Sequence, residues 1–130
     1  MRFAFTFPLL VALFQCSGDE TLSGYGASDA TWKLVEIDGQ VFPANATIKF
    51  PEEGKITGEG PCNQFFGSQL EPYPWFKTEN LASTRRACPD LEAETWMLQS
   101  LDKMTLAEVS ANALILNNDA GGEMVFEAVR

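Results

Sequence analysis

The chain of 130 residues contains no histidine, and its nine basic side chains are outnumbered by 18 acidic ones. Without histidine it cannot form a Ser-His-Asp triad, a Cys-His pair or an imidazole zinc site. A net charge of -9 argues against binding to nucleic acids and anionic lipid headgroups, which requires clustered lysine and arginine. The composition therefore favours a single domain with a non-enzymatic binding or structural role.

A long apolar run occurs only at the start of the chain. Arg2 is followed by an almost unbroken apolar stretch over 3–14, and polar, glycine-rich sequence comes next. The stretch is too short for the roughly 20 residues that cross a bilayer. We therefore expect residues 1–15 to be a secretory signal peptide. A buried core helix is the alternative, and Pro8 within the run argues against it.

The segment Leu13-Phe14-Gln15-Cys16 resembles a bacterial lipobox, in which a cysteine three positions after a leucine receives a lipid. The resemblance implies lipidation of Cys16 and anchoring in the cell envelope. Ser17 resembles the sorting residue of lipoproteins on the periplasmic side of the outer membrane. Phe14 and Gln15 stand where lipoboxes carry small residues, so a secreted or periplasmic protein without a lipid is the alternative.

The rest of the chain divides into a linker and a domain. Residues 16–30 are rich in serine and glycine and lack an apolar period, which predicts a flexible tether. In 31–130, short apolar stretches alternate with turn residues, as is typical of an antiparallel β domain. We expect a hairpin over 48–58, an irregular strand over 75–87, and closing strands at 106–109, 113–117 and 124–126.

One segment of the domain has a helical pattern. Pro89 suits the first position of a helix, and the acidic residues that follow it suit the positive end of the helix dipole. Leu91, Leu98 and Leu101 recur at helical spacing, and Met97 and Met104 widen this apolar stripe. The pattern predicts a helix over 89–103 with these leucines on its buried face.

The motifs and their order resemble the META domain, or HslJ-like, family. The matching pieces are Trp32-Lys-Leu, Thr47-Ile-Lys-Phe50, Cys62-Asn63-Gln-Phe-Phe-Gly67, and Ala82 to Cys88 before the helix. The resemblance implies an α+β, mainly β fold, with a curved antiparallel sheet or partly open barrel packed on one α-helix. It implies no enzyme activity and a role linked to envelope stress or drug resistance. A similar fold occurs in pilotin lipoproteins, which bind apolar tails of partners.

Cys62 and Cys88 are expected to form a structural disulfide. An exported chain with three cysteines leaves one unpaired, and lipidation of Cys16 accounts for it. A redox or nucleophilic thiol is the alternative, but it needs an activating base or a Cys-x-x-Cys spacing. The chain has neither.

The large aromatic residues Tyr73, Trp75 and Phe76 follow Pro72 in a connection between strands. They form a candidate binding lip, because aromatic side chains in a stiff loop lose little entropy on binding. Closure of one end of the core is the alternative. No metal or cofactor is predicted, because the oxygen-rich segment 117–123 lacks the residue order of a calcium loop.

The expected partners are an unknown protein or apolar ligand, and a lipid membrane reached through Cys16. The alternative function is that of an acidic surface inhibitor. A strongly acidic module would attract a basic envelope-directed enzyme such as lysozyme by charge complementarity.

Overall fold

The computed structural model describes residues 18–130. The predicted signal peptide and Cys16 lie outside the described residues. In the described part of the chain, no helix combines the length and apolar character needed to cross a bilayer. The elements of this part are η1 (Leu22–Tyr25), η2 (Ala27–Asp29), β1 (Thr31–Ile37), β2 (Gln40–Val41), β3 (Thr47–Lys49), β4 (Lys55–Glu59), β5 (Gln64–Ser68), β6 (Glu79–Ser83), α1 (Leu91–Lys103), β7 (Leu106–Val109), β8 (Ala113–Asn117) and β9 (Glu123–Val129).

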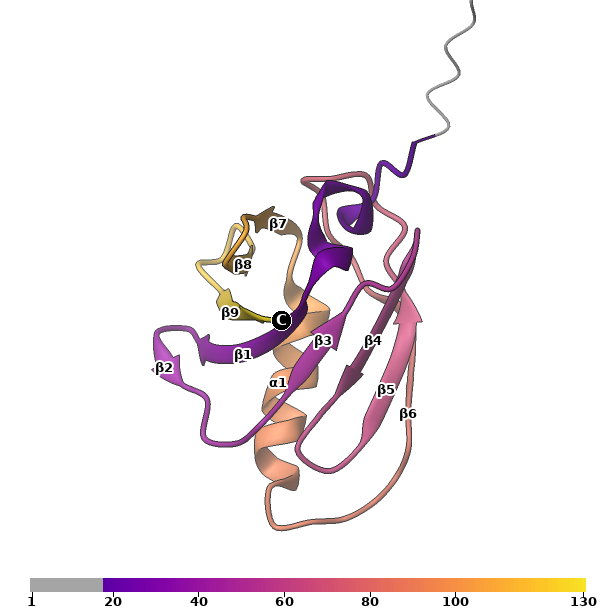
Figure 1. Cartoon of the computed structure of the whole chain (residues 1–130). Coiled ribbons are helices and arrows are strands. Elements are labelled where there is room, and N and C mark those ends of the chain that lie inside the picture. The colour runs from indigo at the N-terminus through magenta and orange to yellow at the C-terminus, as the bar shows by residue number, and fades with distance from the viewer. Residues whose placement is uncertain (1–17) are drawn as a thin grey trace, which may run out of the picture.

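The strands form one antiparallel sheet that does not close into a barrel. Its order is β6-β5-β4-β3-β1-β9-β8-β7, and β2 pairs with β1. The sheet curves around α1, which lies against one of its faces (Figure 1). The predicted fold class, α+β and mainly β, is confirmed in its open-sheet form. The predicted hairpin and closing strands are also present.

The core lies between α1 and the concave face of the sheet. One row of this face crosses four strands, pairing Trp32 with Ile48, Ile48 with Gly58, and Gly58 with Phe65. A Cβ at Gly58 would lie 2.2 Å from the Phe65 ring. Glycine is therefore required at this position for Phe65 to enter the core.

β1 differs from the expected alternation at Val35. The sequence predicts Trp32 and Leu34 on one face and Val35 and Ile37 on the other. A β-bulge between Leu34 and Glu36 shifts the register against β9. The extra residue returns Ile37 to the core face, where it is fully buried.

α1 begins at Leu91, two residues after the predicted start at Pro89. The prediction that Leu91 belongs to the buried face is wrong, because its side chain is exposed. The rest of the predicted stripe is confirmed: Met97 and Leu101 are buried, and Leu98 is partly buried against the core. Glu94 lies on the same face at helical spacing and is buried as well. A carboxylate therefore lies within the stripe that packs on the sheet.

The prediction of a flexible tether over 16–30 is wrong for residues 21–30. This segment forms η1 and η2, and its Leu22 and Ala27 side chains are fully buried in the core. The Trp32 indole N–H donates a hydrogen bond of 2.8 Å to the Ala27 carbonyl oxygen. Two apolar anchors and this bond fix a segment whose composition alone suggests a coil. We call residues 19–30 the N-terminal arm.

The segment over 75–87 contains one short regular strand, β6, where an irregular strand was expected. Before β6, the chain crosses from the end of β5 to the opposite edge of the sheet. Trp75 there forms an isolated antiparallel bridge with Leu106 of β7. The Phe76 N–H donates to the Thr105 carbonyl oxygen at 2.9 Å. This crossing segment links the two edge regions of the open sheet at one end.

Candidate functional site

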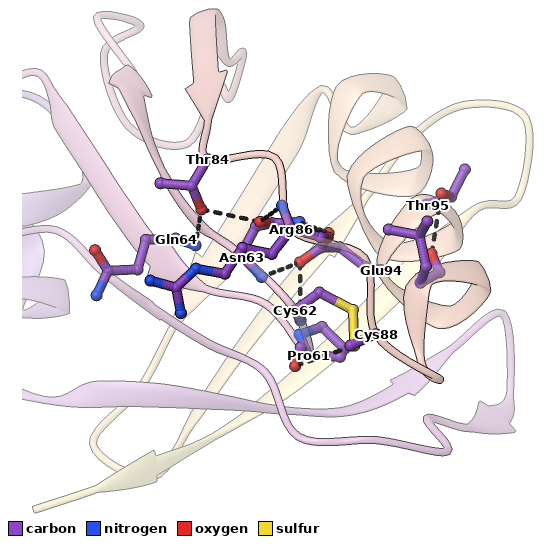
Figure 2. Close-up of a disulfide and its surroundings, with 10 residues drawn as sticks. Pro61, Cys62, Asn63, Gln64, Thr84, Arg86, Cys88, Glu94 and Thr95 are labelled. Atoms are coloured by element: carbon purple, nitrogen blue, oxygen red, sulfur yellow. Dashed lines mark hydrogen bonds between the residues drawn. A yellow bond between two sulfur atoms is a disulfide. The ribbon is translucent and has the colours of Figure 1, made fainter.

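The predicted disulfide between Cys62 and Cys88 is present. The two Cα atoms lie 5.6 Å apart, within the usual range for a bridged pair. The bond joins the turn between β4 and β5 to the segment that leads into α1 (Figure 2). We call these two segments, at residues 60–63 and 84–88, together with Glu94 of α1, the disulfide junction.

Glu94 reaches from α1 into this junction and is only 4% exposed. Its Oε1 accepts hydrogen bonds from the main-chain N–H groups of Cys62, at 3.1 Å, and Asn63, at 2.7 Å. Its Oε2 accepts a third bond from Asn63 Nδ2, at 2.6 Å (Figure 2). Three donors on one carboxylate offset the cost of removing it from water.

The Asn63 side chain extends the same network. Its Oδ1 accepts bonds from the Arg86 N–H, at 2.6 Å, and from Thr84 Oγ1, at 3.0 Å. Its Nδ2 also donates to the Arg86 carbonyl oxygen at 3.0 Å. A Cβ at Gly60 would lie 2.4 Å from Glu94 Oε1, so the close approach of the carboxylate requires glycine there. The arrangement fastens three separate segments to one another.

The chemistry of the junction is that of a structural tie. Both sulfurs are in the disulfide, and each oxygen of Glu94 already accepts at least one hydrogen bond. Within residues 18–130, no three His, Cys, Asp or Glu side chains are close enough together to hold a metal ion. Sequence reasoning found the disulfide but missed Glu94. Its place in the Met97 and Leu101 stripe is the signal that could have revealed it.

The three residues of the candidate binding lip lie in different environments. Phe76 is buried in the core, whereas Trp75 is 56% exposed. Tyr73 is half-buried and stacks on Tyr25 of the N-terminal arm, with ring centroids 4.6 Å apart and planes 17° apart. Phe76 thus helps to close the core, and Tyr73 and Trp75 lie at the surface. Ligand binding by the lip stays a prediction.

Hydrogen bonds hold the lip in place from two sides. The Tyr73 N–H donates to the Glu20 carbonyl oxygen in the N-terminal arm at 2.8 Å. The Tyr73 hydroxyl accepts a bond from the Val109 N–H at 3.1 Å, and the Ala107 N–H donates to the Pro74 carbonyl oxygen at 2.8 Å. The segment is therefore fixed between the arm and β7.

A second exposed aromatic residue lies on the outer face of the sheet. Phe65 and Phe66 are neighbours on β5 and point to opposite faces, so Phe65 is buried and Phe66 is 56% exposed. Phe66 borders a shallow groove of about 470 Å³ that Lys49 and Thr57 also line. This groove is a candidate surface for an apolar group of a partner.

Asp19, at the start of the N-terminal arm, has a perturbed pKa. Burial alone raises its pKa, but hydrogen bonds to its carboxylate from the Ser23 hydroxyl and from the Thr21 hydroxyl and N–H lower it. The net effect is a pKa below the ordinary value of 3.8. The ionised carboxylate therefore stabilises the first turn of the arm.

Comparison with known proteins places this architecture in a family. The META domain family matches residues 26–130. The NMR structure of a protein from Burkholderia xenovorans is similar with a TM-score of 0.64 and 21% identity, covering 82% of this chain and 86% of that one. A crystal structure of a DUF4847 family protein from Bacteroides vulgatus ATCC 8482 is similar with a TM-score of 0.65 and 14% identity, and the match covers 82% of this chain and 95% of that one. At these identities the likeness concerns the fold alone. The comparison with curated proteins gives no match. Because the family match spans nearly the whole described domain, the chain belongs to the META domain family.

Proposed function

We propose that this META-domain protein is a lipid-anchored component of a bacterial cell envelope that acts by binding a partner and not by catalysis. The observation that carries the proposal is the Cys62–Cys88 disulfide. Such bonds persist in oxidising compartments, which supports export. Cys16 is the third cysteine of the chain, and it lies two positions after an apolar stretch of signal-peptide character.

The disulfide junction and the exposed aromatic residues of the domain support different roles. The buried carboxylate of Glu94 is engaged by three N–H donors of the disulfide junction, which suits a structural role. In contrast, the aromatic side chains of Phe66 and Trp75 are each 56% exposed. Large exposed aromatic residues are typical of recognition surfaces. We assign the contact with an apolar tail of a partner protein to Phe66, at the border of a groove that is otherwise lined mostly by polar residues. The proposed role is one in envelope stress or drug resistance.

The anchor is tested by metabolic labelling of cells with a radioactive fatty acid. The wild-type chain should incorporate the label, and Cys16→Ser should not. A variant carrying both Cys62→Ser and Cys88→Ser is the matched control, because it loses two cysteines and keeps the proposed site. Labelling that persists in Cys16→Ser would overturn the anchor, as would an unlabelled wild-type chain in the soluble periplasm.

The alternative function, inhibition of a basic enzyme, rests on the net charge of -9. Capture from envelope extract at low and high salt separates the two functions, because salt screens charge complementarity and not apolar contact. If a partner protein binds the groove beside Phe66, its capture should persist at high salt and should be lost in the Phe66→Ser variant. Capture of a basic enzyme that disappears at high salt, with equal yield for Phe66→Ser, would favour inhibition instead.

A further inference from the structure

The N-terminal arm and the crossing segment bring four apolar or aromatic side chains to one end of the domain. These are Tyr25, Leu70, Tyr73 and Trp75, which we call the aromatic rim. Tyr25, Leu70 and Trp75 are 52%, 62% and 56% exposed, and Tyr73 is half-buried beneath its stack with Tyr25. In Figure 1 the described chain begins at this same end, opposite the start of α1.

Contacts along this end join the rim to the start of the described chain. The Thr21 hydroxyl accepts a hydrogen bond from the Gly54 N–H at 3.4 Å, and a Cβ at Gly54 would touch the Leu70 side chain. The Glu20 carbonyl oxygen accepts the Tyr73 N–H at 2.8 Å. The rim is therefore attached to the residues through which the chain enters the domain.

The distance from Cys16 to this rim is limited by chain length. Three residues separate Cys16 from Glu20. The four Cα-to-Cα steps between them span at most about 14 Å when the chain is fully extended. The headgroup layer on each side of a bilayer is roughly 5 to 8 Å thick. If Cys16 carries a lipid, as proposed above, the rim cannot move far from the membrane surface. The folded arm removes the slack that a flexible tether would have provided.

We infer that the aromatic rim is a membrane-contact surface, and that it inserts its side chains into the interfacial layer of a zwitterionic bilayer. This inference rests on the proposed lipid anchor. Trp and Tyr favour the interface because their rings are apolar and their N–H and O–H groups find polar partners there. Glu20 and Glu71 border the rim, so anionic headgroups should weaken the contact.

The test uses Trp75 as a depth reporter. The chain from Cys16 onward contains all core residues that the structure describes, since these lie between Leu22 and Phe126. With the Cys62–Cys88 disulfide intact, Cys16 supplies the free thiol for coupling to a maleimide lipid in phosphatidylcholine vesicles. The vesicles contain either plain or brominated acyl chains, and bromine quenches only tryptophan that reaches them.

The difference in fluorescence between wild type and Trp75→Phe isolates the Trp75 signal from the other two tryptophans. We expect brominated lipid to reduce this signal about twofold. Tyr25→Ser combined with Leu70→Ser should restore most of it, because less apolar surface enters the interface. Phe66→Ser is the matched control: it removes an equally exposed aromatic residue outside the rim and should leave the quenching unchanged.

Each other outcome overturns the inference in a different way. Equal Trp75 signals in plain and brominated vesicles would show that the rim does not reach the membrane. Quenching that persists fully in Trp75→Phe would assign the contact to another face. If Trp75 is protected from bromine quenching only at a high surface density of the protein, the rim would contact a second copy of the chain and not the membrane.

The coupling experiment also separates this inference from the proposed anchor. Chemical attachment at Cys16 does not depend on what the cell does to that residue. If fatty-acid labelling is absent and Trp75 is still quenched, the proposed anchor is overturned and the membrane contact of the rim is supported. Normal labelling with unquenched Trp75 would support the anchor and overturn the rim.

Discussion

Glu94 binds Asn63 twice, accepting its main-chain N–H at 2.7 Å on one oxygen and its side-chain amide at 2.6 Å on the other. The pair connects α1 directly to the turn between β4 and β5, beside the covalent bond from Cys62 to Cys88. A covalent and a noncovalent tie thus both hold the turn between β4 and β5, and their contributions to stability can be separated by substitution.

Removal of the Glu94 carboxylate should destabilise the domain strongly. We expect Glu94→Ala to lower the free energy of unfolding by about 3 kcal/mol, because three N–H donors lose a charged acceptor in a buried place. Glu94→Gln should have an intermediate effect, since an amide keeps one acceptor and faces Asn63 with a donor. Urea unfolding followed by circular dichroism measures both. Glu92→Ala, an exposed carboxylate on the same helix, is the control and should resemble wild type.

Removal of the disulfide should cost stability and preserve the fold. The bridge closes a loop of 26 positions. In the chain-entropy model, this predicts a loss of about 3.5 kcal/mol for Cys62→Ser combined with Cys88→Ser. The far-ultraviolet spectrum should stay native, because Glu94 still ties the junction. Cys16→Ser, measured in parallel, should leave the unfolding curve unchanged. A double variant as stable as wild type would contradict the loop-closure argument.

Two neighbouring phenylalanines should respond oppositely to the same substitution. Phe65→Ala removes a fully packed ring and should cost about 3 to 5 kcal/mol in the free energy of unfolding. Phe66→Ala removes a ring that is mostly in solvent and should change this free energy little. Thermal and urea unfolding of the two variants provide the comparison. Equal losses of unfolding free energy in the two variants would mean that Phe66 is also packed, and that the groove beside it is not open to a partner.

Asp19 should make the stability of the arm depend on pH. Because its pKa in the folded state lies below the ordinary 3.8, its contribution is complete above that value and is lost as pH falls through the folded pKa. Asp19→Asn should therefore lower the melting temperature more at about pH 7 than at about pH 2. Calorimetry at both pH values measures this difference. Asp29→Asn in η2 controls for the change in net charge. A loss of melting temperature in Asp19→Asn that is larger at low pH would contradict the lowered pKa of Asp19.

Strand positions followed well from local turn chemistry. Ser110 to Asn112 and Asn118 to Gly122 carry turn residues between apolar strands, and β7, β8 and β9 lie where this pattern puts them. The bulge in β1 was not predictable in the same way, because Val35 and Ile37 fit a regular alternation equally well. Pairing with β9, a contact distant in sequence, decides the local geometry there.

The N-terminal arm and Glu94 escaped prediction for related reasons. The arm has only Leu22 and Ala27 as apolar anchors, too few to produce a period, and both depend on core surfaces formed by later residues. A glutamate on a helix is ordinarily exposed, so the sequence alone indicates only a favourable charge near the start of α1 at Glu94. Its burial follows from the donors of Cys62 and Asn63, which the sequence of the helix does not contain.

The position of β1 between β3 and β9 determines how the domain would bear a mechanical load applied through its amino-terminal side. Tension entering there would meet first the arm and then a strand laddered on both flanks, instead of a peripheral strand that can unzip one bond at a time. Fraying at β6 or β7 would leave this load path intact. A domain attached to a surface by its amino-terminal end would thus resist unfolding by tension even while its edge strands open transiently.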